Sequence, residues 1–190
     1  TMQRLLRVRH ELIAGGALTL CASAFGASHT VKFDALPQGQ LPANFTSNGV
    51  DMIQTPYTDT IGNVCAPTAF GVCIIATQAF APCPNGSPPN QLVARSVLVD
   101  FDMTDYAAIL GGPVKKIVFR YLRMTGNVQI RFNGMCFTRP TFGGLANGNY
   151  GGVNYNDNGC RVRLKSNPPP ISQFSVGGAL LAIDNVKAAN

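Results

Sequence analysis

Residues 114–133 read VKKIVFRYLRMTGNVQIRFN, and this stretch decides the fold class. Large apolar side chains occupy every second position on both sides of Gly126: Ile117, Phe119, Tyr121, Val128, Ile130 and Phe132. A period of two places such side chains on one face of an extended strand. β-branched and aromatic residues also favour strands over helices. The stretch therefore predicts strands over 114–122 and 126–133.

The same alternation recurs along the chain, with turn-forming residues between the apolar runs. It predicts further strands at 30–34, 50–53, 71–79, 91–102, 160–165, 171–176 and 180–186. One short helix is predicted from Asp105 to Leu110, with Thr104 or Asp105 as its N-cap. Residues 143–159, rich in Gly and Asn, are predicted to form a surface loop. Many strands joined by turns indicate an all-β fold, a jelly-roll β-sandwich of two antiparallel sheets with about nine or ten strands.

The first 24 residues have the features of a secretory signal peptide. Arg4, Arg7 and Arg9 precede an apolar run from Leu12 to Ala24, which ends in the small residues that signal peptidase accepts. An amphipathic helix that stays attached is the alternative. Cleavage after Ala24 would remove three of 15 basic residues and one of nine acidic residues, which lowers the net charge from +6 to +4 (12 minus 8). We expect a secreted, single-domain protein over residues 30–190.

Five cysteines follow the predicted cleavage point. In an oxidising compartment, cysteines pair where geometry allows. We predict a Cys136–Cys160 disulfide, which closes the Gly/Asn-rich loop, and one further bridge among Cys65, Cys73 and Cys83, with Cys65–Cys73 preferred. A zinc site is the competing interpretation, but the spacing lacks a Cys-x2-Cys pair.

The inventory of ionisable residues argues against an enzyme. The only histidines are His10 and His29, and the only Glu is Glu11, inside the predicted signal. A pair of catalytic carboxylates would need Asp100, Asp102 or Asp105, and solvated aspartates at a strand end are the simpler interpretation. The chain also has no glycine-rich loop of the kind that binds phosphate.

Strand alternation predicts a basic sheet face opposite the apolar positions. Its members are Arg120, Gln129, Arg131, Arg161, Arg163 and Lys165. Guanidinium groups bind carboxylates and sulfates with paired hydrogen bonds, which suits an anionic polysaccharide. A face that only solubilises the protein is the alternative. Tyr150 and Tyr155 near the Asn-rich loop are further candidates for sugar contacts, although packing roles for those rings compete.

Three short motifs give a resemblance. They are Phe33-Asp34-x-Leu36-Pro37, the hairpin Arg131-Phe132-Asn133-Gly134, and Ala182-Ile183-Asp184-Asn185-Val186. Together they resemble extracellular jelly-roll domains of bacterial surface proteins, including those with a PEP-CTERM sorting tail, and more remotely carbohydrate-binding modules. No such tail occurs up to Asn190, so we expect a protein that is released or assembles outside the cell.

The resemblance also implies a structural Ca²⁺ ion. In such modules an aspartate near the first strand and another near the last help to bind the ion, and these positions correspond to Asp34 and Asp184, with Asn185 as a further ligand. Hard oxygen ligands suit Ca²⁺. The alternative is that Asp184 and Asn185 only cap a strand end through hydrogen bonds to the backbone.

Two functions remain open from the sequence. One is a non-catalytic protein of the cell envelope or extracellular matrix that binds polysaccharide or associates with copies of itself. The other is a structural subunit of an extracellular fibre or surface layer. Nucleic acid is a poor partner for a modestly basic exported chain, and no run after the predicted signal is long and apolar enough to span a membrane.

Overall fold

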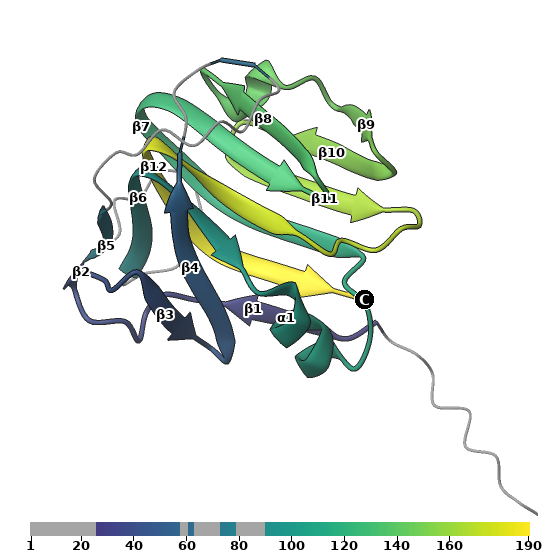
Figure 1. Ribbon diagram of the computed structural model, residues 1–190, viewed down its shortest axis with the longest axis horizontal. Helices are drawn as coiled ribbons and strands as arrows, with labels where there is room; N and C mark the ends of the chain where they lie inside the picture. Colours follow the sequence, from purple (N-terminus) through teal and green to yellow (C-terminus); the bar gives the residue numbers. More distant parts are fainter. Residues whose placement is uncertain (1–25, 58–60, 63–72, 79–89) are drawn as a thin grey trace, which may run out of the picture.

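The computed structural model describes residues 26–57, 61–62, 73–78 and 90–190, which fold into one antiparallel sheet with little helix (Figure 1). The all-β prediction is confirmed. The strands are β1 (Ser28–Val31), β2 (Gly39–Gln40), β3 (Asn44–Ser47), β4 (Val50–Pro56), β5 (Cys73–Gln78), β6 (Asn90–Phe101), β7 (Lys116–Phe132), β8 (Met135–Arg139), β9 (Gly148–Tyr150), β10 (Val153–Asp157), β11 (Arg161–Ser166) and β12 (Phe174–Ala189). The helix α1 spans Met103–Leu110, and a 3₁₀ turn, η1, spans Phe142–Gly144.

Hydrogen bonds connect all the described strands into this one sheet. The main order is β2-β5-β6-β12-β7-β11-β10-β9, with β1 also on β12, β4 on β6, β3 on β4 and β8 on β7. Two separate sheets, as the sequence predicted, are not confirmed, because β6, β12 and β7 run continuously through the sheet. The N-terminal strand β1 lies along the end of β12, and the amide of Asn190 donates to the carbonyl oxygen of Ala27 at 3.2 Å.

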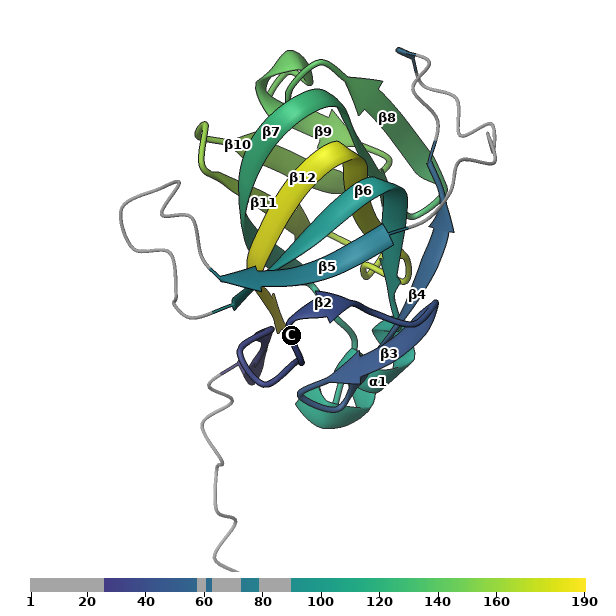
Figure 2. The same cartoon turned by 90° about the vertical axis from the view of Figure 1, so that its left-hand side faces the viewer.

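The three long strands bend sharply at one level (Figure 2). Ser96 in β6 and Gly126 in β7 have φ values of 52° and 69°, and the register of β12 shifts between Gly178 and Leu180. Gly177 and Gly178 lie between the two neighbouring backbones. A Cβ atom on Gly177 would overlap the carbonyl oxygen of Val97, so only glycine fits at this crossing.

The bend corrects the predicted strand boundaries. Gly126 lies within the 17-residue strand β7 and does not end a strand. The predicted strands 171–176 and 180–186 both overlap the single strand β12, which begins at Phe174. A glycine inside an alternating pattern marks a turn or a bend equally well, and only the pairing with neighbouring strands distinguishes the two.

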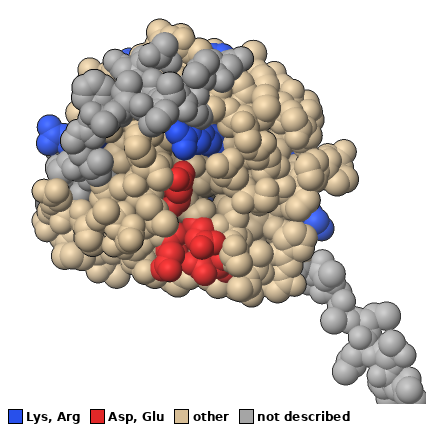
Figure 3. All heavy atoms as spheres, viewed as in Figure 1, with Lys and Arg blue, Asp and Glu red and all other residues tan. Residues whose placement is uncertain are grey.

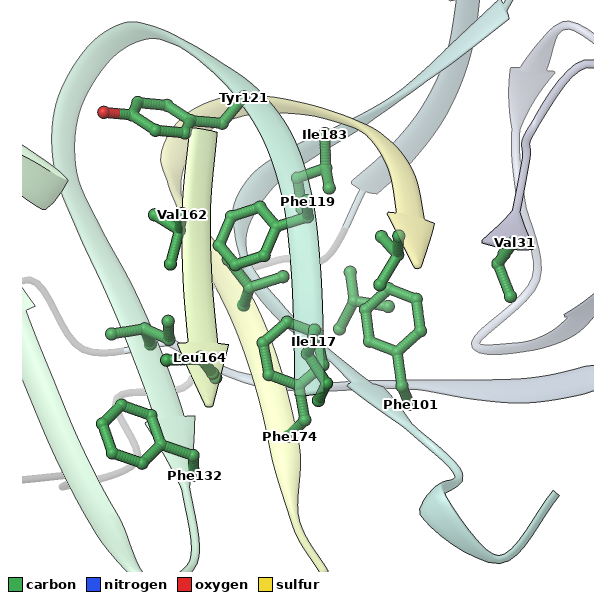
Figure 4. Close-up of a cluster of buried hydrophobic side chains, with 14 of the residues drawn as sticks. Val31, Phe101, Ile117, Phe119, Tyr121, Phe132, Val162, Leu164, Phe174 and Ile183 are labelled. Atoms are coloured by element: carbon green, nitrogen blue, oxygen red, sulfur yellow. The ribbon is translucent and has the colours of Figure 1, made fainter. Parts of the chain in front are cut away.

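The core lies between the two halves of the bent sheet (Figure 4). The rings of Phe119 in the first half of β7 and Phe174 in the second half of the sheet have centroids 5.6 Å apart. All the side chains predicted to face inward are buried, and Tyr121, at 7% exposure, is the most exposed of them. The inward set is Ile117, Phe119, Tyr121, Val128, Ile130, Phe132, Val162 and Leu164.

Two local predictions differ from the structure. Asp102, not Thr104 or Asp105, is the N-cap of α1, and its carboxylate accepts from the amides of Thr104 at 2.7 Å and Asp105 at 3.3 Å. The predicted loop 143–159 contains the strands β9 and β10, because Val153 and Tyr155 bury alternate side chains.

We expect Gly126→Ala to destabilise the protein more than Gly111→Ala. Both glycines have a similar positive φ (69° and 65°), but only at Gly126 would a Cβ atom overlap another atom, the Cβ of Ala179. The positive φ costs each variant about 1–2 kcal/mol, and the overlap adds about 1–3 kcal/mol. Urea unfolding measures both costs, and Ala179→Gly in the Gly126→Ala background should recover the overlap part. Equal losses at both glycines would contradict this explanation of the bend.

Candidate functional site

Six cations lie on the outer surface of the first half of the sheet, and we call them the basic face: Lys116, Arg120, Arg161, Arg163, Lys165 and Lys187. They come from three adjacent strands. In the pairing of β11 with β7, Arg161 is opposite Arg120 and Lys165 is opposite Lys116. Val118 lies between Arg163 and Lys187, so the cations surround this one apolar position.

The core determines which way these side chains point. Ile117 and Phe119 on β7, and Val162 and Leu164 on β11, are fully buried. Because successive side chains of a strand point to opposite faces, the residues between them point outward. Arg161, Arg163, Lys165 and Lys187 are exposed, whereas Lys116 and Arg120 are half-buried. The apolar alternation thus places the charges in two facing rows.

In these rows, positively charged side chains of β7 lie directly opposite positively charged side chains of β11. Residues directly opposite in an antiparallel pair have Cβ atoms about 4.5–5.5 Å apart, and like charges there are destabilising. Burial lowers the pKa of the Lys116 ammonium group, and the charges of Arg163, Lys187, Arg161 and Lys165 lower it further. Asp184 is the only acidic residue in β7, β11 and β12; it is opposite Arg120 in the pairing of β12 with β7 and is 2% exposed, whereas no carboxylate of these strands is opposite Lys116, Arg163 or Lys165. An anion bound outside the sheet would relieve this repulsion.

The structure separates the predicted members of this face. Arg120, Arg161, Arg163 and Lys165 come together as predicted. Arg131 is opposite Ser175, beyond the bend in β7, so it does not belong to the basic face. Gln129 lies on the same second half and is fully buried.

Sequence reasoning missed Lys116 and Lys187. Lys116 is in phase with Arg120, so alternation could have found it. Lys187 joins only through the pairing of β12 with β7, which no local pattern contains.

The predicted sugar-contacting tyrosines have packing roles. Tyr155 is 2% exposed, and its hydroxyl donates to the carbonyl oxygen of Phe142 at 2.9 Å. The half-buried Tyr150 donates to the carbonyl oxygen of Ala146 at 2.7 Å, and its ring packs edge-on against Phe137. Tyr155 therefore anchors β10 in the core and is not an exposed ring for a ligand.

The residues predicted to bind Ca²⁺ have other partners in the structure. One carboxylate oxygen of Asp34 accepts from the amide of Asn90 at 3.3 Å. Both carboxylate oxygens of Asp184 accept from Asn185, one from its backbone amide and one from its side chain. In the described part of the chain, no three His, Cys, Asp or Glu side chains form a group that could hold a metal ion. Calcium binding stays a prediction.

Aspartates gather on a different surface, visible as the red cluster in Figure 3. A groove of about 340 Å³ is lined in part by Asp51, Asp100 and Asp102. Asp102 caps α1, and a carboxylate oxygen of Asp105 accepts from the amide of Asp51 at 2.9 Å. The carboxylate of Asp105 thus joins α1 to β4, whereas that of Asp102 stabilises the start of α1.

The predicted cysteine pairs are only partly within the described residues. Cys136 lies in β8 opposite Arg131, and Cys160 immediately precedes β11, where its carbonyl oxygen accepts from the amide of Tyr121. Cys73 begins β5, whereas Cys65 and Cys83 lie outside the described residues. The disulfide pairing stays a prediction.

Comparisons of the chain with protein-family models, curated proteins and solved structures find no match. Within the described ranges, no helix has both the length and the apolar character needed to cross a membrane. The functional argument therefore rests on the geometry of the basic face and its surroundings.

We expect Arg163→Gln to raise the pKa of Lys116 toward its ordinary value. Arg163 is the largest of the neighbouring charges that lower this pKa, after the effect of burial. A pH titration of the lysine side chains by NMR measures the change, with Arg95→Gln, on β6, as the control that leaves Lys116 unaffected. An unchanged Lys116 pKa in Arg163→Gln would show that the cations are too far apart to interact.

We expect the folded protein to lose stability as the pH rises above about 10. Burial raises the pKa of Tyr106, Tyr121 and Tyr155 far above the value of 10.0 for an exposed tyrosine. A raised pKa in the folded state stabilises that state fully below the unfolded pKa, and this contribution disappears as the pH rises past it. Tyrosinate absorbance followed together with circular dichroism should show at least these three tyrosines ionising only as the chain unfolds. Ionisation of all five near pH 10 without unfolding would contradict this.

Proposed function

We propose that this chain is a secreted, non-catalytic protein of the cell envelope or extracellular matrix that binds an anionic polysaccharide on its basic face. The observation that carries the proposal is the opposition of like charges in β7 and β11: Lys165 faces Lys116, and Arg161 faces Arg120, whose neighbour on the other side is Asp184. Such pairs cost stability in the free protein. The negative charges of a bound polyanion would offset the repulsion between these cations and attract each of them.

The chemistry of the cations favours carboxylates. An arginine side chain presents a planar fork of N–H groups that matches a carboxylate, and such charge-assisted pairs are the stronger hydrogen bonds. Three of the six cations are arginines, and Arg161 and Arg163 are both exposed on one strand. An extended chain of uronic-acid residues, which carries a carboxylate on every sugar ring, suits two facing rows of cations.

Other parts of the proposal rest on the sequence. The apolar leader over residues 1–24 supports secretion, and the absence of Glu beyond Glu11 supports a non-catalytic role. The jelly-roll interpretation also belongs here, with the two facing halves of the bent sheet corresponding to the two sheets of a sandwich. A Ca²⁺ ion near Asp34 and Asp184 would be structural in this proposal.

The test is a binding titration with polygalacturonate, a polysaccharide with a carboxylate on each residue. We expect Arg161→Gln combined with Arg163→Gln to weaken binding at least about tenfold, because one charge-assisted hydrogen bond contributes about 1.5–3 kcal/mol and each 1.4 kcal/mol is about a factor of ten. The matched control removes two arginines outside the basic face, through Arg95→Gln and Arg131→Gln. This control should change the affinity less than about twofold.

Two results would overturn the proposal. One is an equal loss of affinity in both double variants, which would indicate a general charge effect. The other is no binding of polygalacturonate by the unaltered protein. Light scattering of the same protein without polysaccharide tests self-association, the other expectation from the sequence.

A further inference from the structure

A pocket of about 330 Å³ opens where β7 begins its bend. Its walls come from three parts of the chain: the centre of β7, the η1 turn, and the turn between β10 and β11. The lining residues are Tyr121, Leu122, Arg123, Thr141, Gly143, Asp157, Gly159 and Cys160. The pocket therefore combines a carboxylate, a guanidinium group and an aromatic side chain in one concave site, as ligand pockets commonly do.

The carboxylate of this pocket is held in place. The Tyr121 hydroxyl donates to Asp157, with its oxygen 2.9 and 3.0 Å from the two carboxylate oxygens. The amide of Gly159 donates to the same side chain at 3.1 Å. The ring of Phe142, from η1, packs edge-on against Tyr121 with centroids 4.6 Å apart. Asp157 is thus a fixed hydrogen-bond acceptor, and it is only half-buried.

The guanidinium group is also positioned. Nη1 of Arg123 donates to the carbonyl oxygens of Gly126 at 3.2 Å and Pro140 at 3.1 Å. These two bonds use one nitrogen of the fork. A guanidinium group carries five N–H donors. No described residue accepts from Nε or Nη2 of Arg123, so these donors can bind a ligand. Arg123 is exposed, so a carboxylate from solvent can reach them.

The pocket lies beside the end of the basic face along β7 and β11, with Tyr121 pointing to the opposite side of the sheet from Arg120. Arg120 directly precedes Tyr121, and Arg161 directly follows Cys160. The two segments are joined by the hydrogen bond from the amide of Tyr121 to the carbonyl oxygen of Cys160 at 3.2 Å. A polymer chain lying over Arg120 and Arg161 therefore reaches the pocket by passing over the turn between β10 and β11.

We infer that this pocket binds one uronic-acid residue of the polysaccharide that the basic face holds. The sugar carboxylate pairs with Arg123, and hydroxyl groups of the ring donate to Asp157. The carboxylate and the hydroxyl groups of one sugar ring thus bind two side chains, Arg123 and Asp157, that the protein already holds in position. The inference rests on the proposed function and names its substrate class.

Gly143→Leu tests the inference by filling the pocket. A Cβ atom on Gly143 would lie 3.5 Å from a carboxylate oxygen of Asp157 and 3.7 Å from the Thr141 hydroxyl, which are ordinary contacts. The added side chain therefore occupies the pocket without a backbone overlap. Gly148→Leu is the matched control, because Gly148 in β9 has open space around its Cβ position. Thermal unfolding of both variants establishes that each is folded.

The probes are a short oligogalacturonate and inorganic polyphosphate, a linear polyanion without sugar rings. We expect Gly143→Leu to weaken oligogalacturonate binding at least about tenfold and to leave polyphosphate binding within about twofold. Gly148→Leu should change neither. Unchanged oligogalacturonate binding in Gly143→Leu, or an equal loss of both probes, would overturn the inference and leave the basic face as an anion site. If the unaltered protein binds neither probe, the proposed function itself fails.

A second variant tests the carboxylate contact. Arg123→Gln should weaken binding of oligogalacturonate but not of its methyl ester, in which the carboxylates are uncharged. Equal effects on the acid and the ester would show that Arg123 does not pair with the sugar carboxylate.

Discussion

The close approach of three backbones at one level of the sheet is the constraint on which the rest of the structure depends. Gly177 and Gly178 lie between β6 and β7, and a Cβ atom on Gly178 would be 2.6 Å from the carbonyl oxygen of Asn127. Because Gly177 and Gly178 have no side chains, the backbones of β6, β12 and β7 can approach closely and bend together. The turn brings Phe119 over Phe174 and closes the core. The same turn separates Arg131 from the other arginines and forms the pocket around Asp157.

The core and the basic face are two sides of the same strands. On β7 and β11, the buried residues alternate with the charged ones, so the packing of Phe119 and Leu164 holds the outward side chains in rows. The repulsion between these rows is a cost that core burial offsets. In the proposed function, the ligand removes the cost, and the free protein is therefore the less stable form.

The alternation within residues 114–133 and 160–165 was sufficient to predict strands there, their buried side chains and four of the six cations. It could not predict the bend, because Gly126 has the same local pattern whether a strand ends or turns there. The assignment of Arg131 failed for this reason. Lys187 and the pocket around Tyr121 and Asp157 depend on contacts between residues far apart in the chain, which a local pattern does not contain. The Gly/Asn-rich segment was predicted as a loop because its composition outweighed the buried pair Val153 and Tyr155.

The pairing of β1 with β12 brings both ends of the described domain to one place, where Asn190 donates to Ala27. Domains with adjacent ends tolerate circular permutation and insertion into a host protein. Here Ala189 is opposite Lys116, whereas the pocket begins at Tyr121, about 17 Å further along β7 at about 3.3 Å per residue. A host protein or a solid support joined at Asn190 would therefore present the domain with its pocket facing outward.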